Sequence, residues 1–141
     1  NTPSESYGEI VSYIRRANDR IMERIEGGKD EDGAKIAVTR YTIIASNGRY
    51  SIVRAEPITG RTHQLRVHFK GLGCPITGDT MYGSSSEFIG RHALHAASTE
   101  FFHPDSGERI RISAPLADDM VLLIRSVFSD ADDILEKIGN I

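Results

Sequence analysis

Apolar positions form two runs in neighbouring stretches of the chain, residues 36–43 and 50–53. Both stretches are rich in β-branched and aromatic residues, and the dipeptide Asn47-Gly48 lies between them. Asn-Gly tolerates the positive φ that a two-residue type I′ turn needs, so the pattern predicts a β-hairpin. We expect the second strand to end at Pro57, because proline cannot donate a ladder hydrogen bond.

Residues 8–26 carry a pattern that fits two structures. Apolar residues recur there at helical spacing, and Gly27 would end such a helix; these residues are Ile10, Ile14, Ala17, Ile21 and Ile25. Asn18-Asp19 is turn-like, however, and the high β-branched content favours strands. Periodicity alone leaves both structures open. The polar residues that follow, 27–33, predict a loop.

A short helix is expected after the hairpin and should run to about Lys70. Thr59 or Thr62 would cap its N-terminus through a side-chain oxygen. Gly71 and Gly73 would end it, since glycine readily adopts the left-handed conformation that follows many helices.

Helical spacing divides the side chains of this helix between two faces. Leu65 and Phe69 share one face, whereas His63, Arg66 and Lys70 share another. The pattern therefore puts Arg66 among polar neighbours and not in an apolar core.

The last third of the chain predicts strands followed by two helices. The strand segments are 91–97, 99–102 and 108–114, with a turn at 103–107 between the last two. Apolar residues recur at helical spacing in the stretch that follows Asp118, and again from Ile134 onward. Together with the hairpin, these elements predict an α+β fold with a mainly antiparallel or mixed sheet and flanking helices.

Length and composition narrow the class of protein. A chain of 141 residues with 39% hydrophobic and 26% charged residues fits one folded domain. No apolar run approaches the ~18 residues that a transmembrane helix needs, so we expect no membrane partner. Cys74 is the single cysteine, which excludes an internal disulfide and favours a reducing cytoplasm.

Charge is unevenly distributed along the chain. The net charge is −3, yet the segment from 54 to 70 holds one acidic residue, Glu56, and four basic residues: Arg54, Arg61, Arg66 and Lys70. A local basic patch on an acidic chain can bind phosphate with a strong dependence on salt.

Residues whose side chains can take part in binding or catalysis concentrate between Glu56 and Gly83. Two arginines, two histidines and a glutamine fall within eight positions, namely Arg61, His63, Gln64, Arg66 and His68. Neither a hydrophobic core nor a solvated loop requires that mixture, whereas guanidinium groups hold phosphates or carboxylates bidentately. Glycines and prolines on either side indicate a shaped backbone. We therefore expect function in this segment.

Several of these residues have more than one interpretation from the sequence alone. Arg66 fits a surface helix arginine as well as a functional one. Arg61, which follows Gly60, would bind either phosphate with help from backbone N–H groups or a local carbonyl. His63 and His68 fit residues that orient their neighbours by hydrogen bonds better than they fit proton carriers.

The remaining histidines do not make a convincing metal site. His92 and His95 form a His-x-x-His pair, and His103 lies nearby, but strand alternation would put residues three apart on opposite faces. No cysteine or carboxylate completes a ligand set, so we expect no metal. Asp79 follows a glycine and fits a turn residue that makes an Asx bond.

The central segment resembles the RluA-type pseudouridine synthases, which isomerise uridine in structured RNA. Residues 57–68 match the family motif P-x-T-G-R-T-H-Q-[IL]-R-V-H, and residues 73–83 continue it as G-x-P-I-x-G-D-x-x-Y-G. Further similar landmarks are 37–41, 91–96, 103–104 and 114–116. The resemblance covers roughly residues 8–120, and it implies that residues 8–26 are extended and not helical.

Part of the family's pattern is missing. The catalytic aspartate sits in an H-R-L-D-x-x-T-S-G motif and the active-site tyrosine in a Y-x-A strand, and this sequence contains neither. Both would precede Asn1. We therefore expect residues 1–141 to be the C-terminal part of one pseudouridine synthase catalytic domain, inactive without its N-terminal part. One face of the half-sheet should be unusually apolar, because the missing part would cover it.

The resemblance implies an RNA pseudouridine synthase, an isomerase for rRNA or tRNA that needs no cofactor. The aspartate attacks the nucleoside, the glycosidic bond breaks, the uracil turns and a C–C bond forms, after the nucleotide has left its stack. Arg66, by its position in T-H-Q-L-R-V-H, is the predicted catalytic residue, paired with the aspartate that this chain lacks. The predicted RNA-binding residues are Arg61, His63, Gln64, His68 and Lys70.

Two other functions remain as alternatives at this point. The first is an RNA-binding module without catalysis, which would retain only the basic surface. The second is a metal-dependent hydrolase built on the histidines. The expected partners are structured RNA and the missing N-terminal half of the domain.

Overall fold

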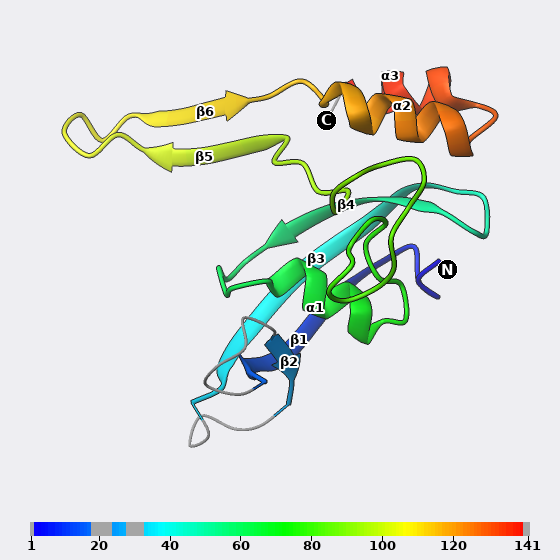
Figure 1. Cartoon of the computed structure of the whole chain (residues 1–141). Helices are drawn as coiled ribbons and strands as arrows, with labels where there is room; N and C mark the ends of the chain where they lie inside the picture. The colour runs from blue at the N-terminus through cyan, green and yellow to red at the C-terminus, as the bar shows by residue number, and fades with distance from the viewer. Residues whose placement is uncertain (1, 18–23, 28–32, 140–141) are drawn as a thin grey trace.

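The computed structural model describes residues 2–17, 24–27 and 33–139 of the chain (Figure 1). Its main sheet has the strand order β2-β1-β3-β4, and every neighbouring pair is antiparallel. The strands are β1 (Tyr7–Arg16), β2 (Arg24–Glu26), β3 (Lys35–Ser46) and β4 (Ser51–Pro57). The extended conformation that the resemblance implied near the N-terminus is confirmed for β1 and β2. Residues 18–23 and 28–32 lie outside the described part, and so does most of the predicted 27–33 loop.

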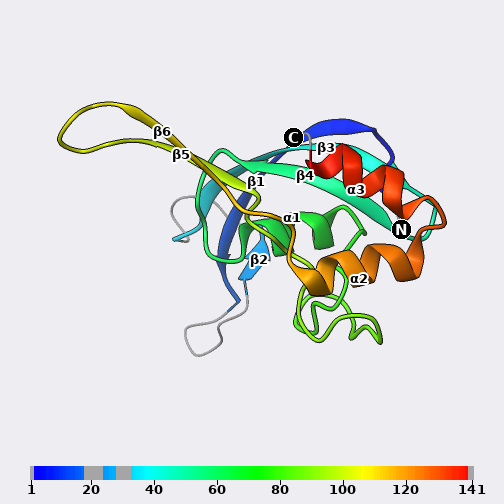
Figure 2. The same cartoon turned by 90° about the horizontal axis from the view of Figure 1, so that it is seen from above.

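Three helices in the described residues accompany the sheet: α1 (Gln64–Gly71), α2 (Asp118–Val127) and α3 (Ala131–Gly139). Figures 1 and 2 show α1 lying across the sheet, while α2 and α3 lie together at the end where β3 turns into β4. The predicted α+β fold with a mainly antiparallel sheet is therefore confirmed, as are the two C-terminal helices. No helix in the described residues is both long enough and apolar enough to span a membrane.

The predicted β3–β4 hairpin is present, but its turn differs in type. The N–H of Asn47 donates to the carbonyl of Tyr50 (3.1 Å), so Gly48 and Arg49 are the two central residues. Only Gly48 has a positive φ, of 85°. A type I′ turn requires positive φ at both central positions, whereas type II′ requires it at the first alone. Asn47 supports the turn from outside through Oδ1, which accepts from the N–H of Tyr50 (2.8 Å).

The prediction of a strand at residues 91–97 is wrong, because the structure has no regular element there. The next two predicted strands do form a hairpin, β5 (Ser98–Phe102) with β6 (Arg109–Ser113). This hairpin projects from the body of the molecule, as Figure 2 shows. The backbone of 91–97 instead packs against the 77–78 segment, where the N–H of Ala93 donates to the carbonyl of Thr77 (2.8 Å).

The hydrophobic core has two parts that follow the strand periodicity. Alternate residues of β3, namely Ala37, Thr39 and Tyr41, are buried beneath α1. Ala37 belongs to a cluster with Ile14, Val67 and Tyr82, and so ties β1, β3 and α1 together. A second cluster, formed by Ile124, Phe128, Ala131 and Ile134, packs α2 and α3 against the hairpin end of the sheet.

Candidate functional site

The polar face of α1 gathers around one aromatic ring, that of Tyr82. The Arg66 guanidinium carbon lies 4.9 Å from the ring centroid and the Lys70 Nζ lies 5.5 Å from it. The His63 ring meets the Tyr82 ring edge-on at 5.6 Å, and its Nδ1 shares a 2.8 Å hydrogen bond with the phenol oxygen. We call these four residues, with Asp79, the Tyr82 cluster. The predicted common face of His63, Arg66 and Lys70 is confirmed.

Arg66 is held by a carboxylate of this same chain. Its Nε donates to Oδ2 of Asp79 and its Nη2 donates to Oδ1, each at 2.8 Å. The Asp79 side chain is 0% exposed and that of Arg66 is 15% exposed. The sequence analysis named a partner for Arg66 only outside the chain, and the structure adds one inside it: Asp79, 13 residues further on. Parallel bonds of this kind are both strong and orienting.

Asp79 also fulfils the turn role that the sequence predicted. Its Oδ1 accepts from the N–H groups of Met81 (3.1 Å) and Tyr82 (3.2 Å), which is an Asx-type arrangement. The hydrogen bonds from Arg66 lower the pKa of the Asp79 carboxyl and outweigh the opposing effect of burial. The bond to Asp79 in turn raises the pKa of Arg66. The pair is therefore an ionised, internally bonded unit.

Helix α1 begins in an uncommon way. His63 precedes its first residue with a φ of 58°, in the left-handed region, and no side chain caps the helix. The prediction that Thr59 or Thr62 is the N-cap is therefore wrong. A non-glycine residue stays in this conformation only where its surroundings hold it. The hydrogen bond from His63 to Tyr82 supplies such support.

The end of α1 follows the prediction more closely. Gly73 has a φ of 71°, and its N–H donates to the carbonyl of Lys70 (2.9 Å). The N–H of Cys74 donates to the carbonyl of Phe69 (2.9 Å). These two bonds form a Schellman motif with glycine in its left-handed position. Gly71 is the last residue of the helix itself, so Gly73 alone provides the stop.

Gln64 lies in the interior and anchors the start of α1 to the sheet. Its Nε2 donates to the carbonyl of Val38 (2.9 Å) and to Oγ1 of Thr39 (3.0 Å). Its Oε1 accepts from Oγ1 of Thr59 (2.8 Å) and from the N–H of Arg61 (2.9 Å). All four hydrogen-bonding positions of the amide are thereby used.

His68 extends this network towards β1. Its Nδ1 bonds to the Thr39 hydroxyl (2.9 Å) and its Nε2 to the Ser12 hydroxyl (3.1 Å). The Thr39 hydroxyl, which also accepts from Gln64, links that amide to the imidazole, and a neutral His68 donates from one ring nitrogen and accepts at the other. Burial lowers the pKa of His68, which favours this neutral form.

Two of the predicted RNA-binding residues lie in the interior. Gln64 and His68 are buried, and their polar atoms are used inside the protein. They hold α1 in place and do not present themselves to a ligand. Arg61 donates from Nε to the carbonyl of Ile36 (2.9 Å), so it makes the local carbonyl bond that was one of its two interpretations. Lys70 is exposed and His63 is half-buried.

Two histidines of the second half of the chain, His95 and His103, serve local structure. His95 Nε2 bonds to the carbonyl of Ala114 (3.3 Å), and His103 Nδ1 accepts from the N–H groups of Asp105 and Ser106 in the β5–β6 turn. Among the described residues there is no group of three or more His, Cys, Asp or Glu that could hold a metal ion.

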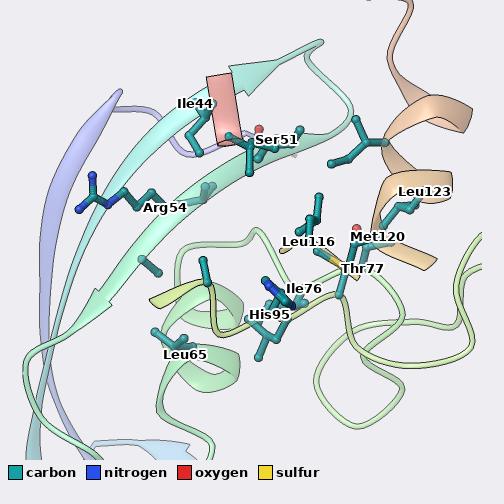
Figure 3. A pocket seen from close by; sticks show the side chains of 18 of the residues that line it. Ile44, Ser51, Arg54, Leu65, Ile76, Thr77, His95, Leu116, Met120 and Leu123 are labelled. Atoms are coloured by element: carbon teal, nitrogen blue, oxygen red, sulfur yellow. The ribbon is translucent and has the colours of Figure 1, made fainter. Parts of the chain in front are cut away.

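An open groove lies on the apolar face of α1, away from the Tyr82 cluster. Its volume is about 1810 Å³, and its walls come from β4, α1, α2 and the segments 74–78 and 93–97. Figure 3 shows apolar side chains along the groove: Leu65, Ile76, Met120 and Leu123 from these elements, and Leu116 just before α2. An apolar groove of this kind is typical of a binding or interaction site.

Sequence reasoning missed how the second half of the motif is used. Tyr82 and Asp79 both occur in the string G-D-x-x-Y-G, yet nothing in their spacing shows that they meet α1. Thr39 and Ser12 carried no signal beyond strand alternation, which puts Thr39 on the inward face of β3.

Known RNA pseudouridine synthases are similar to this chain in sequence. A family model described as RNA pseudouridylate synthase matches residues 1–71. YhcT of Bacillus subtilis, named as an uncharacterized RNA pseudouridine synthase, is 46% identical over 86% of this chain and 40% of its own length. A protein of Xanthomonas campestris named ribosomal large subunit pseudouridine synthase D is 37% identical over 83% of this chain and 38% of its own length.

A solved structure shares the fold. The human RNA pseudouridylate synthase domain containing 4 superposes with a TM-score of 0.68 and 25% identity, covering 87% of this chain and 57% of that one. The present chain thus spans about 40% of the length of the bacterial relatives that it matches.

Proposed function

Because this chain belongs to the RluA-type family of RNA pseudouridine synthases, we propose that it forms part of an enzyme that isomerises uridine to pseudouridine in RNA. The observation that carries the proposal is the bidentate Arg66–Asp79 pair against Tyr82, built from two separate parts of the family motif. An oriented guanidinium is the group that an ionised carboxylate nucleophile needs beside it.

The nucleophile itself comes, in this proposal, from a segment outside these 141 residues. Asp79 is the carboxylate beside Arg66, but it is buried and already accepts four hydrogen bonds. It has no path to a nucleoside. A second carboxylate, from the remainder of a catalytic domain, would meet the guanidinium of Arg66, become ionised there and attack the target nucleoside.

Two apolar surfaces support a partner segment of this kind. One is the groove beside α1, and the other is one face of the β5–β6 hairpin. On that face Phe101 pairs with Ile110 and Thr99 with Ile112, and Phe101 and Ile112 are 44% and 54% exposed. We propose that the remaining part of the domain covers both surfaces, so that residues 1–141 constitute its C-terminal part.

The exposed edge of the Tyr82 cluster is the proposed RNA contact. Lys70 near the end of α1, and Arg61 and His63 ahead of its start, provide positive charge and hydrogen-bond donors. Such groups bind the phosphate backbone and set its orientation without reading sequence. The substrate would be structured rRNA or tRNA, modified in the cytoplasm.

The test is to incubate these residues, carried within a complete catalytic domain, with unmodified rRNA and tRNA transcripts. We expect pseudouridine at discrete positions, detected by nuclease digestion and chromatography, and no product from an Arg66→Ala variant. The 141-residue chain by itself should give no product. RNA binding by the complete domain with no pseudouridine in any transcript would refute the proposal and favour an RNA-binding module.

A further inference from the structure

We propose that Asp79 is a positioning residue for catalysis: it fixes the Arg66 guanidinium so that one edge is committed inside the protein and the other edge faces the reacting carboxylate. This inference rests on the proposed function. It concerns a residue that neither attacks the substrate nor touches it, and that acts through Arg66 alone.

The hydrogen bonds of Asp79 argue against a direct role. Oδ2 accepts from Arg66 Nε, while Oδ1 accepts from Arg66 Nη2 and from the N–H groups of Met81 and Tyr82. With no exposed surface and both oxygens engaged, this carboxylate cannot approach a ribose or a uracil. The oxygens of Asp79 bind the Arg66 guanidinium and the backbone of the turn that carries Asp79.

Arg66 retains donors after this pairing. A guanidinium has five N–H groups in a planar fork, and Asp79 uses two of them. The three others, two on Nη1 and one on Nη2, lie on the remaining edges of the same plane. Tyr82 lies against the guanidinium at 4.9 Å, so the plane is restrained by the ring as well as by the carboxylate. A second carboxylate can therefore bind a guanidinium whose orientation is already set.

The turn that carries Asp79 is itself firmly placed. Gly78 has a φ of 76°, and its backbone runs directly against the carbonyl of Arg91. The N–H of Asp79 donates to the carbonyl of Ile76 (3.1 Å), and the N–H of Gly83 donates to the carbonyl of Asp79 (2.8 Å). A long arginine on the surface of an eight-residue helix would otherwise sample many rotamers. The loop, and not the helix, decides where the guanidinium points.

Charge makes the role of Asp79 measurable. The Arg66–Asp79 pair has no net charge, so Arg66 offers the nucleophile directed hydrogen bonds and little excess positive charge. Replacing Asp79 by asparagine removes the compensating negative charge and loosens the fork. The rate should fall because the guanidinium is misdirected, while the acid limb of the pH–rate profile should move to lower pH because the uncompensated arginine favours the ionised nucleophile.

The experiment compares Asp79→Asn, Arg66→Ala and the double variant in the complete domain, by single-turnover rates at saturating RNA. We expect Asp79→Asn to lower the rate by about 100-fold, the loss typical of a misplaced catalytic group. RNA affinity should stay within about 3-fold, since RNA contacts are spread over many groups. The double variant should be no slower than Arg66→Ala, because Asp79 acts only through Arg66.

Asp119→Asn is the matched control. Asp119 binds Arg91 through the same two-bond geometry, at 2.8 and 2.7 Å, on the half-exposed surface of α2. The single-turnover rate and the pH–rate profile of the Asp119→Asn variant should equal those of the wild-type protein. Rates that multiply in the double variant, or an unchanged pH profile in Asp79→Asn, would show that Asp79 only stabilises the fold and would overturn the inference.

A second measurement does not depend on the folding of the variants. Hydrogen exchange of the Arg66 Nε–H in the wild-type complete domain should be slow, because Asp79 holds that hydrogen in the interior. Rapid exchange would overturn the inference directly. A wild-type domain that makes no pseudouridine would refute the proposed function and with it the catalytic role of Asp79, whereas an active domain with multiplicative rates would refute the role of Asp79 alone.

Discussion

A Cβ atom added to Gly78 would lie 2.2 Å from the carbonyl oxygen of Arg91. The two backbones are therefore in direct contact, and a side chain at position 78 would push the segments apart. The residue that follows is Asp79, which holds Arg66. A glycine thus sets the position of the carboxylate that orients the arginine.

The first prediction follows from this contact. Gly78→Ala combines a clash with backbone and a left-handed φ, so it should lower the free energy of unfolding by at least about 2 kcal/mol. Gly60→Ala is the matched control, since a Cβ at Gly60 meets nothing within 4 Å and its φ is not left-handed. Gly60→Ala should change the free energy of unfolding by no more than about 0.5 kcal/mol. Urea denaturation of both variants tests this; equal stabilities would contradict the contact.

The second prediction concerns the Arg66–Asp79 pair and stability. Arg66→Ala leaves a buried carboxylate without its partner and should cost about 3–5 kcal/mol. Arg66→Lys keeps the charge but loses the planar fork, so it should lie between the alanine variant and the wild-type protein, in stability and in rate.

The exposed pair of Arg125 with Asp132 is a control for these variants. Arg125→Ala should change the free energy of unfolding by less than about 1 kcal/mol, as is usual for surface ion pairs. Urea midpoints measured at pH 7 are sufficient for the comparison. Similar losses in Arg66→Ala and Arg125→Ala would mean that Asp79 is not enclosed.

The third prediction addresses the buried amide. Gln64→Met preserves much of the side-chain volume but removes four hydrogen bonds, which leaves the N–H of Arg61 and the hydroxyl proton of Thr59 without the acceptor they share. Unpaired buried groups cost roughly 1–3 kcal/mol each, so the loss should exceed about 2 kcal/mol. Thr62→Ala, at an exposed neighbouring position, is the control. Chemical denaturation decides, and a neutral Gln64→Met would refute the anchoring role.

The fourth prediction is a dependence of stability on pH. Burial lowers the pKa of His68 below its ordinary value of 6.5, so the unfolded chain binds the proton more readily than the folded one. The contribution of neutral His68 to the free energy of unfolding is complete above pH 6.5. It declines as the pH falls below 6.5, and the free energy of unfolding then changes by no more than about 1.4 kcal/mol per pH unit.

Comparing wild type with His68→Gln by urea denaturation between pH 8 and pH 5 isolates this residue. The variant should be less stable at pH 8 but should lose less on acidification. Asp79 does not interfere, because its pKa is lowered from 3.8 and its stabilisation is lost only at more acidic pH. Parallel pH curves for the two proteins would contradict a buried, neutral His68.

The fifth prediction separates RNA contact from catalysis. Lys70→Ala in the complete domain should weaken RNA binding for all sequences alike, and should reduce the slope of log affinity against log salt by about 0.7–0.9. The pseudouridylation rate at saturating RNA should change little. Lys137→Ala, in the last turn of α3, is the control. An unchanged salt dependence in Lys70→Ala would exclude a phosphate contact at Lys70.

The elements of the fold follow from local patterns in the sequence. Two apolar, β-branched runs around Asn47-Gly48 predicted the β3–β4 hairpin, and helical spacing predicted α1 and its polar face. These succeed because strand and helix periods are set by the backbone of each residue and its near neighbours. Predictions that depended on one exact local bond failed: neither Thr59 nor Thr62 caps α1, because the Thr59 hydroxyl is used by Gln64 and the helix starts from a left-handed His63.

The sequence by itself thus determined the α+β class and the family, and it singled out the segment in which we propose that the chemistry lies. Tertiary structure alone decided what each polar residue of that segment does. Gln64 and His68 became interior anchors because β1 and β3 supply hydroxyls to them, and Arg66 gained Asp79 because the Gly78 turn folds back onto α1. Burial and pairing depend on residues far apart in the chain, which no local pattern records.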